Sequence, residues 1–531
     1  MKKSKKTLTL LICLFMAVVM LASCTPGGTQ TGDAQAPGGA ANQPGQGADP
    51  AARDTLVIAT EVETAYFHPF NHNLTQTEWV NNFMYARLFR LGAEELVPVP
   101  SLVSTWELLS DTVWEFTLHS GVRFHNGEIM TAEDVKASIE YSQKFPGTEL
   151  HTASIAEVIV VDDLTFQVVT HNPNFLLPTS MTSGFFSVVP RSLIEAGHDF
   201  GTDPIGAGPY RFVEYVPSER IVFEAFDDYF DTANAPRIRH VVYRFIPEDA
   251  ARTIALETGE VHFLQTVGAA DISRLQGTEG ATVLTRPGLP MHFLALNTER
   301  TDLHFDNPIV RQAIDMAIYK PDLAMVFVDG FATPVYSQVH PGLGGTSSAN
   351  INHYDPEAAR ALLAQAGIDP SEISFQINVN NDGWRRMAEL MQAQLRQNLG
   401  IEVHTIEQLD MATHVTKLNS GEFDAGQTSG IVQHGAFWWD FYAHSRNIGN
   451  FNRSRLNDPE IDRMIEAAMG TADINEANRI TEEITAHLND ITLHIPLFIV
   501  DIVRAHHADL VVPFVDAAGT THFETVYWRT Q

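Results

Sequence analysis

The residues best suited to bind a small molecule lie in the segment 426–442, which is rich in glycine, aromatic and polar side chains. Phe437, Trp438 and Trp439 are consecutive there. Aromatic side chains offer a large contact area at a low cost in rotamer entropy, so these rings could form an apolar wall beside a ligand. The alternative is that one or two of them fill the hydrophobic core. The segment therefore predicts a binding surface.

Catalytic and metal-binding patterns find little support in the sequence. There is no Gly-x-Ser-x-Gly motif, no HExxH motif and no phosphate-binding loop. Histidine is plentiful, with 22 residues, and neutral imidazole is a common metal ligand. However, His68 and His72 are separated by Pro69, and His506 and His507 would alternate sides in a strand. We therefore expect a protein without catalytic activity, cofactor or metal site, and a surface hydrolase is the disfavoured alternative.

The N-terminus is typical of an export signal. Four lysines precede an apolar run over residues 8–22, which is too short to span about 30 Å of hydrocarbon. The run ends in Leu-Ala-Ser followed by Cys24, an arrangement that resembles the lipobox of bacterial lipoproteins. The resemblance implies a signal peptide over 1–23 and lipidation of Cys24. Residues 24–53 are poor in large apolar side chains and predict a disordered tether.

Charge and length restrict the class of partner. The chain has 531 residues and a net charge of −31, which argues against nucleic acid as a partner. Cys13 and Cys24 are the only cysteines, so the body of the chain has no disulfide. No later stretch approaches about 18 consecutive apolar residues. We expect a large extracytoplasmic monomer of several domains, attached to the membrane through lipid.

The elements beyond residue 54 mix strands and helices. Alternating apolar residues over 114–124 and again over 158–170 predict two hairpins. Helices are expected after Asn307, Asp355 and Asp458, because each is an Asx residue followed by proline. Residues 131–134 resemble a capping box that opens another helix. The expected class is therefore α/β.

Many ordered segments resemble the family 5 solute-binding proteins, the peptide and nickel class of extracytoplasmic receptors for ABC importers. The matching segments are 100–106, 121–128, 131–135, 206–210, 228–230, 255–261, 296–298, 310–314, 354–363 and 366–367. The resemblance covers nearly the whole chain after the tether. It implies an ABC permease as partner and a peptide or peptide-like solute as ligand. A nickel chelate, an opine or an oligosaccharide is the alternative ligand within the family.

The resemblance also implies a two-lobed periplasmic-binding-protein-like fold with an extra subdomain and a ligand cleft between the lobes. By analogy, the core subdomain of lobe 1 combines 54–90, 206–290 and 497–531. The extra subdomain of lobe 1 is 91–205, and lobe 2 is 291–496. Crossovers between the lobes are expected near 288–296 and 490–500, where glycine and proline interrupt the chain.

Further candidate ligand contacts follow from the resemblance. Peptide binders of the family supply an aspartate to the ligand's amino group from the loop that corresponds to 426–442. Here His434 occupies that place and Asp440 follows six residues later. Either Asp440 takes the role, or the ligand lacks a conventional peptide N-terminus. Tyr66 and His68 occupy a position at the cleft edge.

Trp384 and Arg385 could also reach the cleft. Arg385 could hold a ligand carboxylate there, although a solvated position at a helix start is the favoured interpretation for it.

Overall fold

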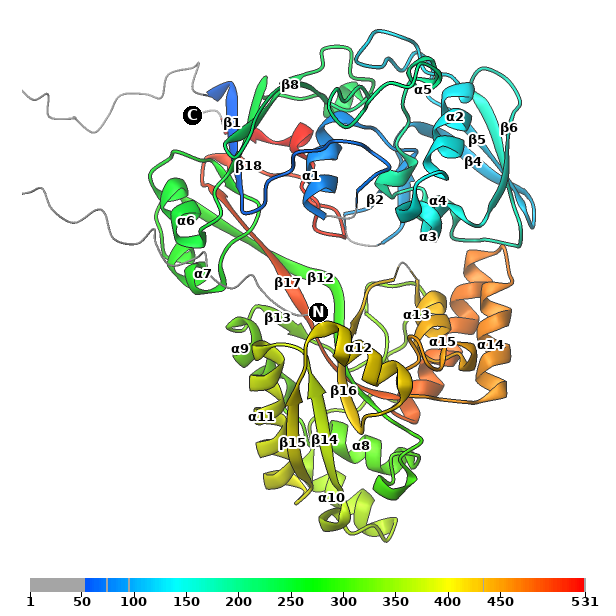
Figure 1. Cartoon of the computed structure of the whole chain (residues 1–531), viewed down its shortest axis with the longest axis vertical. Helices are drawn as coiled ribbons and strands as arrows, with labels where there is room; N and C mark the ends of the chain where they lie inside the picture. The colour runs from blue at the N-terminus through cyan, green and yellow to red at the C-terminus, as the bar shows by residue number, and fades with distance from the viewer. Residues whose placement is uncertain (1–52, 73–74, 94–95, 433, 530–531) are drawn as a thin grey trace, which may run out of the picture. The chain divides into compact units, whose positions relative to one another are not determined.

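The computed structural model describes residues 53–72, 75–93, 96–432 and 434–529 (Figure 1). These residues belong to one compact unit. The expected signal peptide over 1–23, Cys24 and the tether over 24–53 lie outside the described residues, apart from Arg53. Within the described parts of the chain, no helix has the length and apolar character needed to cross a membrane.

An eleven-stranded mixed sheet runs through the described chain. Its strand order is β15-β14-β16-β12-β17-β11-β1-β10-β9-β8, and β13 pairs with β17 off this path. The bounds are β1 Thr55–Thr60, β8 Tyr210–Val216, β9 Arg220–Ala225, β10 His240–Phe245, β11 Phe263–Leu264, β12 Ala281–Leu296, β13 Ala332–Pro334, β14 Ser374–Val379, β15 Glu402–Gln408, β16 Ala425–Gly430 and β17 His494–His507.

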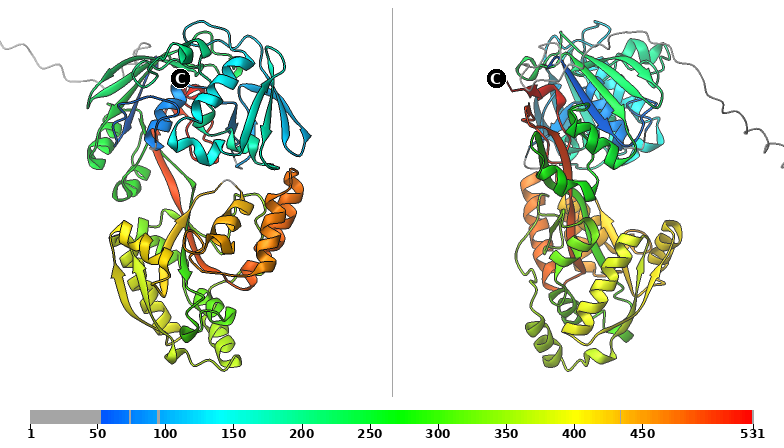
Figure 2. Two further views of the ribbon diagram at one scale, coloured as in Figure 1. Left: turned by 45° about the vertical axis from the view of Figure 1, so that its right-hand side comes forward. Right: turned by 90° about the vertical axis from the view of Figure 1, so that its left-hand side faces the viewer.

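The long strands β12 and β17 connect the two ends of this sheet (Figures 1 and 2). They pair antiparallel from Ala281 opposite His507 to Ala295 opposite His494. The register shifts between Pro287 and Met291, so residues 288–290 bulge out of the ladder. The bulge is held by His340, whose Nε2 lies 2.9 Å from the carbonyl oxygen of Gly288. The segments in which we expected crossovers lie in and beside these two strands.

A separate four-stranded sheet has the order β4-β5-β7-β6. Its strands are β4 Val103–Ser110, β5 Val113–Leu118, β6 Ile155–Val160 and β7 Thr165–Thr170. The antiparallel pair of β6 and β7 confirms the hairpin predicted over 158–170.

The hairpin predicted over 114–124 is wrong, because β5 pairs with β4 and β7. Residues 122–124 belong instead to a local turn, in which the amide of Phe124 donates to the carbonyl oxygen of Glu128. Two shorter ladders complete the strands, β2 Phe89–Leu91 with β3 Pro98–Pro100 and β18 Leu510–Val511 with β19 Tyr527–Trp528.

The capping residues confirm the predicted helix starts. Asn307, Asp355 and Asp458 each accept backbone amides in the first turns of α8 Pro308–Met316, α10 Pro356–Gln365 and α14 Pro459–Met469. The capping box of Thr131 and Asp134 opens α2 Ala132–Ser142.

The remaining helices are spread along the described chain between and after the strands. They are α1 Thr75–Met84, α3 Glu149–Thr152, α4 Leu177–Ser180, α5 Arg191–Glu195, α6 Asp249–Glu257, α7 Ala269–Gln276, α9 Lys320–Val328, α11 Asp382–Asn398, α12 Met411–Ser420, α13 Gly435–Tyr442 and α15 Ile474–Asp490.

Separate hydrophobic cores define two lobes. In the first lobe, one core surrounds β1, β8–β10 and α1, and another lies between the four-stranded sheet and α2. In the second lobe, one core surrounds β14 with α8–α11; another surrounds α13–α15 and also includes Phe175 and Leu176 of the first lobe. The chain passes into the second lobe along β12 and returns along β17. The residue bounds expected for the subdomains remain predictions.

Candidate functional site

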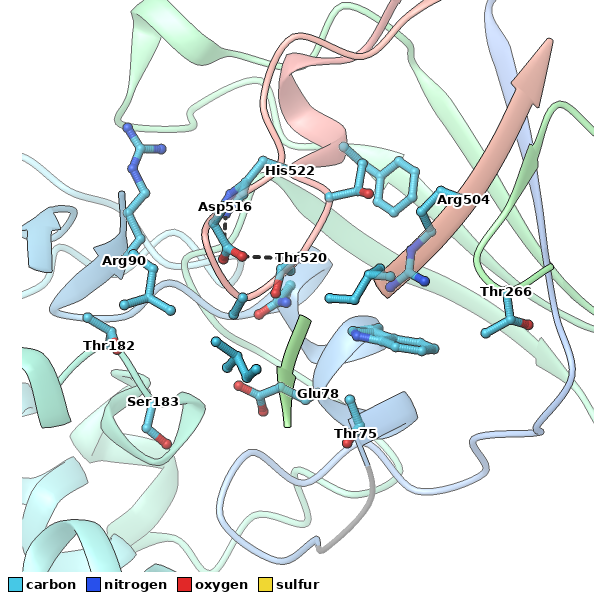
Figure 3. A pocket seen from close by; sticks show the side chains of 18 of the residues that line it. Thr75, Glu78, Arg90, Thr182, Ser183, Thr266, Arg504, Asp516, Thr520 and His522 are labelled. Atoms are coloured by element: carbon cyan, nitrogen blue, oxygen red, sulfur yellow. Dashed lines mark hydrogen bonds and ion pairs between the residues drawn. The ribbon is translucent and has the colours of Figure 1, made fainter. Parts of the chain in front are cut away.

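A cavity of about 730 Å³ lies where α1, β2, the 288–290 bulge, β17 and the loop 516–524 meet (Figure 3). Most of its lining comes from the first lobe, and Val328, Phe331 and Ile431 are contributed from residues beyond β12. Its apolar walls include Trp79, Phe89 and Ile502. A cavity of this size is in the range used for small organic ligands. The polar groups inside it therefore decide what it can bind.

Arg504 on β17 places a buried guanidinium at the cavity (Figure 3). Its side chain stacks over the indole of Trp79 at 5.0 Å from the ring centroid, and the residue is only 6% exposed. Within the described parts of the chain, the guanidinium has no hydrogen bond and no ion pair with a carboxylate; its Nε is enclosed without a partner. Burial lowers the pKa of Arg504 to about 10, so it stays charged at neutral pH. The site therefore holds a cation that is ready for an anionic partner.

Asp501 also belongs to the lining, but it is three residues before Arg504 on β17, so alternation along the strand directs its side chain to the opposite face. It is half-buried and accepts a hydrogen bond of 2.9 Å from the hydroxyl of Thr333 on β13. Burial raises the pKa of the Asp501 carboxyl. Asp501 therefore belongs to the contact with β13 and not to the surroundings of Arg504.

Other charges at the cavity are already paired. Arg87 forms an ion pair of 2.6 Å with Glu78 and donates a hydrogen bond of 2.9 Å to the carbonyl oxygen of Thr182. Glu78 also accepts a hydrogen bond of 3.1 Å from the amide of Gly184. These contacts connect α1 to the segment 182–184, so the ion pair of Arg87 and Glu78 stabilises this wall of the cavity.

His522 lies between two buried carboxylates in the C-terminal loop, and Figure 3 shows it beside one of them, Asp516. Its Nε2 is 3.4 Å from Asp516 and its Nδ1 is 3.1 Å from Glu524. Burial opposes protonation, but Glu524 and Asp516 outweigh it and raise the pKa of His522 to about 9. Asp516 also accepts the amide of Thr520 at 2.8 Å. The imidazolium therefore fixes the loop that forms one side of the cavity.

The geometry suits binding of a solute with a carboxylate. Arg504 can donate hydrogen bonds to that carboxylate from its fork of N–H groups. The apolar walls can contact the remainder of the ligand. Among the described residues, no cluster of three or more His, Cys, Asp or Glu side chains could hold a metal ion.

None of the eight sequence-predicted ligand residues lines this cavity. His434 caps α13, where its Nδ1 accepts the amide of Ala436 at 3.0 Å and its Nε2 lies 2.7 Å from Asn478. Burial lowers the pKa of His434 to about 4, so the ring is neutral. Phe175 of the first lobe packs against it. Contact between His434 and ligand remains a prediction.

The aromatic segment lies on α13. Trp438 and Trp439 are 1% and 0% exposed and belong to the core of α13–α15, which favours a packing role for both. Phe437 is partly buried against the same core. Asp440 forms an ion pair with Arg446, and burial raises the pKa of its carboxyl. The structure brings these residues together on one helix, but their contact with ligand is untested.

The remaining candidates lie in separate places. Tyr66 is exposed, whereas His68 is buried and accepts the amide of Phe70 at 3.1 Å. Trp384 is buried in the second lobe beside His292. Arg385 is solvated at the start of α11 and pairs with Glu389, as the favoured interpretation expected.

Sequence reasoning missed Arg504 as a site residue. A signal was present, because Arg504 is the one arginine or lysine in the largely apolar and histidine-containing strand 494–507. A charged residue is rarely buried without a partner, so this position is a candidate for ligand contact. The cavity around it, however, depends on α1, which is more than 400 residues away in sequence.

Comparisons with known proteins agree with this architecture. The sequence profile described as "Bacterial extracellular solute-binding proteins, family 5 Middle" matches residues 97–449, more than half of the chain. The glutathione-binding protein GsiB of Salmonella paratyphi A is 25% identical over 477 residues, which cover 87% of this chain and 91% of that protein. The dipeptide-binding protein of Escherichia coli is 26% identical over 520 residues, which cover 89% and 94%.

A solved structure shows the same fold. The structure of HbpA2 from Haemophilus parasuis has a TM-score of 0.81 at 21% identity and covers 90% of this chain and 100% of that one. The fold match and the profile match together confirm the α/β, periplasmic-binding-protein-like class expected from the sequence. The chain therefore belongs to the bacterial extracellular solute-binding proteins of family 5, which are extracytoplasmic substrate receptors of ABC importers and not enzymes.

Proposed function

We propose that this receptor binds peptides or peptide-like solutes and that Arg504 holds their carboxylate. The observation that carries the proposal is the buried guanidinium at the cavity, which forms no hydrogen bond and no ion pair among the described residues. Two relatives support this ligand class by their names, since one binds a dipeptide and another binds glutathione.

The physical reason is the cost of desolvation. A buried charge without a partner costs several kcal/mol, and mutual attraction with a well-placed ligand charge offsets that cost. Arg504 suits this role because its fork matches a carboxylate in two parallel hydrogen bonds. The stacked Trp79 ring holds the guanidinium plane in place.

The experiment is calorimetric titration of the purified protein with a set of short peptides in three forms: free, C-terminally amidated and N-acetylated. A hydrogen bond to a charged group contributes about 1.5–3 kcal/mol, so we expect the amidated form to bind roughly 10- to 150-fold more weakly. In Arg504→Gln, the free peptide should be weakened to a similar extent, and amidation should cost little further. Equal affinities of free and amidated peptides for the wild-type protein would contradict the proposal.

Arg479→Gln is the matched control. Arg479 lies on the exposed face of α15, where it pairs with Glu476 and Glu483. Its loss removes the same charge from the molecule without touching the cavity. We expect peptide affinity in this variant to equal that of the wild type.

We also propose that the mature receptor is a monomer anchored to the outer face of the membrane by lipidated Cys24, from which it delivers solute to its permease. The lipobox-like Leu-Ala-Ser-Cys sequence supports this. Mass spectrometry of the N-terminal peptide from a lipoprotein-competent host should show an acylated Cys24. An unmodified Cys24, or equal membrane association of Cys24→Ala, would contradict the lipid anchor.

A further inference from the structure

A buried aromatic contact joins the two lobes at a place that is outside the paired strands β12 and β17. Phe175, between β7 and α4 in the first lobe, lies edge-to-face on the imidazole of His434 at 4.9 Å between ring centroids and an interplanar angle of 73°. Phe175 is 5% exposed, and His434 is 2% exposed. Phe175 and Leu176 belong to a hydrophobic cluster whose other buried members come from residues 291–499.

The first-lobe side of the contact is fixed by hydrogen bonds. The indole Nε1 of Trp114 on β5 donates to the carbonyl oxygen of Asn174 at 3.2 Å. The side chain of Asn174 donates to the hydroxyl of Ser154 at 3.0 Å and accepts the amide of Leu176 at 3.0 Å. These hydrogen bonds fix the short segment that carries Phe175. Packing of its ring therefore costs little further conformational entropy of the backbone.

The second-lobe side is also fixed. The Nδ1 atom of His434 accepts an amide at the start of α13, so its proton is on Nε2, which donates to Asn478 of α15 at 2.7 Å. A Cβ atom on Gly344 would lie 2.7 Å from that same Nε2, so glycine allows the chain to pass close behind the ring. The imidazole thus keeps one orientation against Phe175.

The position of this contact gives it a mechanical role. The chain crosses between lobes along β12 and β17, so bending of these strands changes the separation of Phe175 and His434. Neither residue lines the 730 Å³ cavity. Because the contact is buried, separation of the lobes would expose two rings to water.

We propose that Phe175 and His434 form a latch that stabilises the lobe arrangement seen here independently of ligand. The latch shifts the conformational equilibrium of the receptor towards the state in which the two lobes are in contact. Ligand binding then stabilises a state that is already favoured. This inference goes beyond the proposed function and does not depend on which solute is bound.

The test is a distance measurement between the lobes by double electron–electron resonance on the full chain. Cys13→Ser and Cys24→Ser leave a background without cysteine, and Glu195→Cys and Arg463→Cys place labels on exposed positions of α5 and α14. In the absence of ligand, Phe175→Ala should lengthen and broaden the distance distribution. Phe175→Leu, which keeps apolar volume but removes the ring, should shift it in the same direction by less.

Phe451→Ala is the matched control, because Phe451 packs on Phe441 within the second lobe and is 39% exposed. It should leave the distances unchanged. A distribution identical to that of the parent in folded Phe175→Ala would overturn the latch. If that variant does not fold, an identical distribution in Phe175→Leu would overturn it instead. No ligand is needed, so failure of the latch and failure of the peptide proposal are separate results.

Discussion

Arg504 carries the proposed function, because its buried guanidinium lines the cavity and forms no hydrogen bond or ion pair among the described residues. Glu61 and Asp516 favour its charged form without pairing with it. Other charges at the same wall are paired, such as Arg87 with Glu78. In the proposal, a ligand carboxylate supplies the missing partner.

Local signals in the sequence were sufficient to predict some residues and not others. Arg385 was interpreted as a solvated residue at a helix start, and the structure places it there. Trp438 and Trp439 could be recognised as a cluster, but sequence could not decide between core and ligand wall, because this depends on how α13 packs against α15. Arg504 depends still more on tertiary structure, since Trp79 and the C-terminal loop create its surroundings.

At the scale of elements, helix starts were predictable because their stabilising contacts are local. An Asx side chain and the amides that it caps are within three residues of each other, as in α14, where Asp458 accepts the amides of Glu460 and Ile461. Strand pairing over 114–124 was not predictable from alternation, since β5 found partners on both sides in β4 and β7. Alternation predicts which face is buried but does not specify the partner strand.

The cap of α14 predicts a measurable effect on stability. Asp458→Ala removes the acceptor for the amides of the first turn, and loss of such a cap costs about 1 kcal/mol. Urea unfolding should show this decrease. Asp458→Asn keeps an acceptor oxygen at the same place, so its stability should remain close to that of the wild type. Equal losses of stability in both variants would mean that charge, not capping, is responsible.

At the scale of the whole molecule, buried neutral histidines in both lobes predict destabilisation by acid. Burial lowers the pKa to about 4 in His68, His125, His262, His292 and His434, and to about 3 in His494. The unfolded chain takes up protons near the ordinary pKa of about 6.5, before the folded chain does. Their contribution to stability is therefore complete above about pH 6.5 and is lost as the pH falls towards 4.

His292 gives the sharpest test of this dependence. Its ring lies among Phe327, Trp384 and Phe498, and its Nδ1 has no hydrogen-bond partner. In His292→Phe, the free energy of unfolding should decrease less steeply between pH 6.5 and 4 than in the wild type. The difference in slope should be up to about 1.4 kcal/mol per pH unit. Urea midpoints at several pH values would measure this, and an unchanged slope would show that His292 is already protonated or is not responsible.

The two lobes joined by β12 and β17 are a feature of the family fold. The cavity at Arg504 and the contact of Phe175 with His434 are the features from which we infer the ligand and the conformational behaviour of this receptor. The central claim is that the solute is peptide-like and is held by Arg504. Native mass spectrometry of gently purified protein, with Arg504→Gln beside it, tests this most directly. We predict a set of peptide masses released from the wild type and strongly reduced occupancy in the variant. A single mass that fits a metal chelate, an opine or a sugar, with equal occupancy in both proteins, would contradict the account.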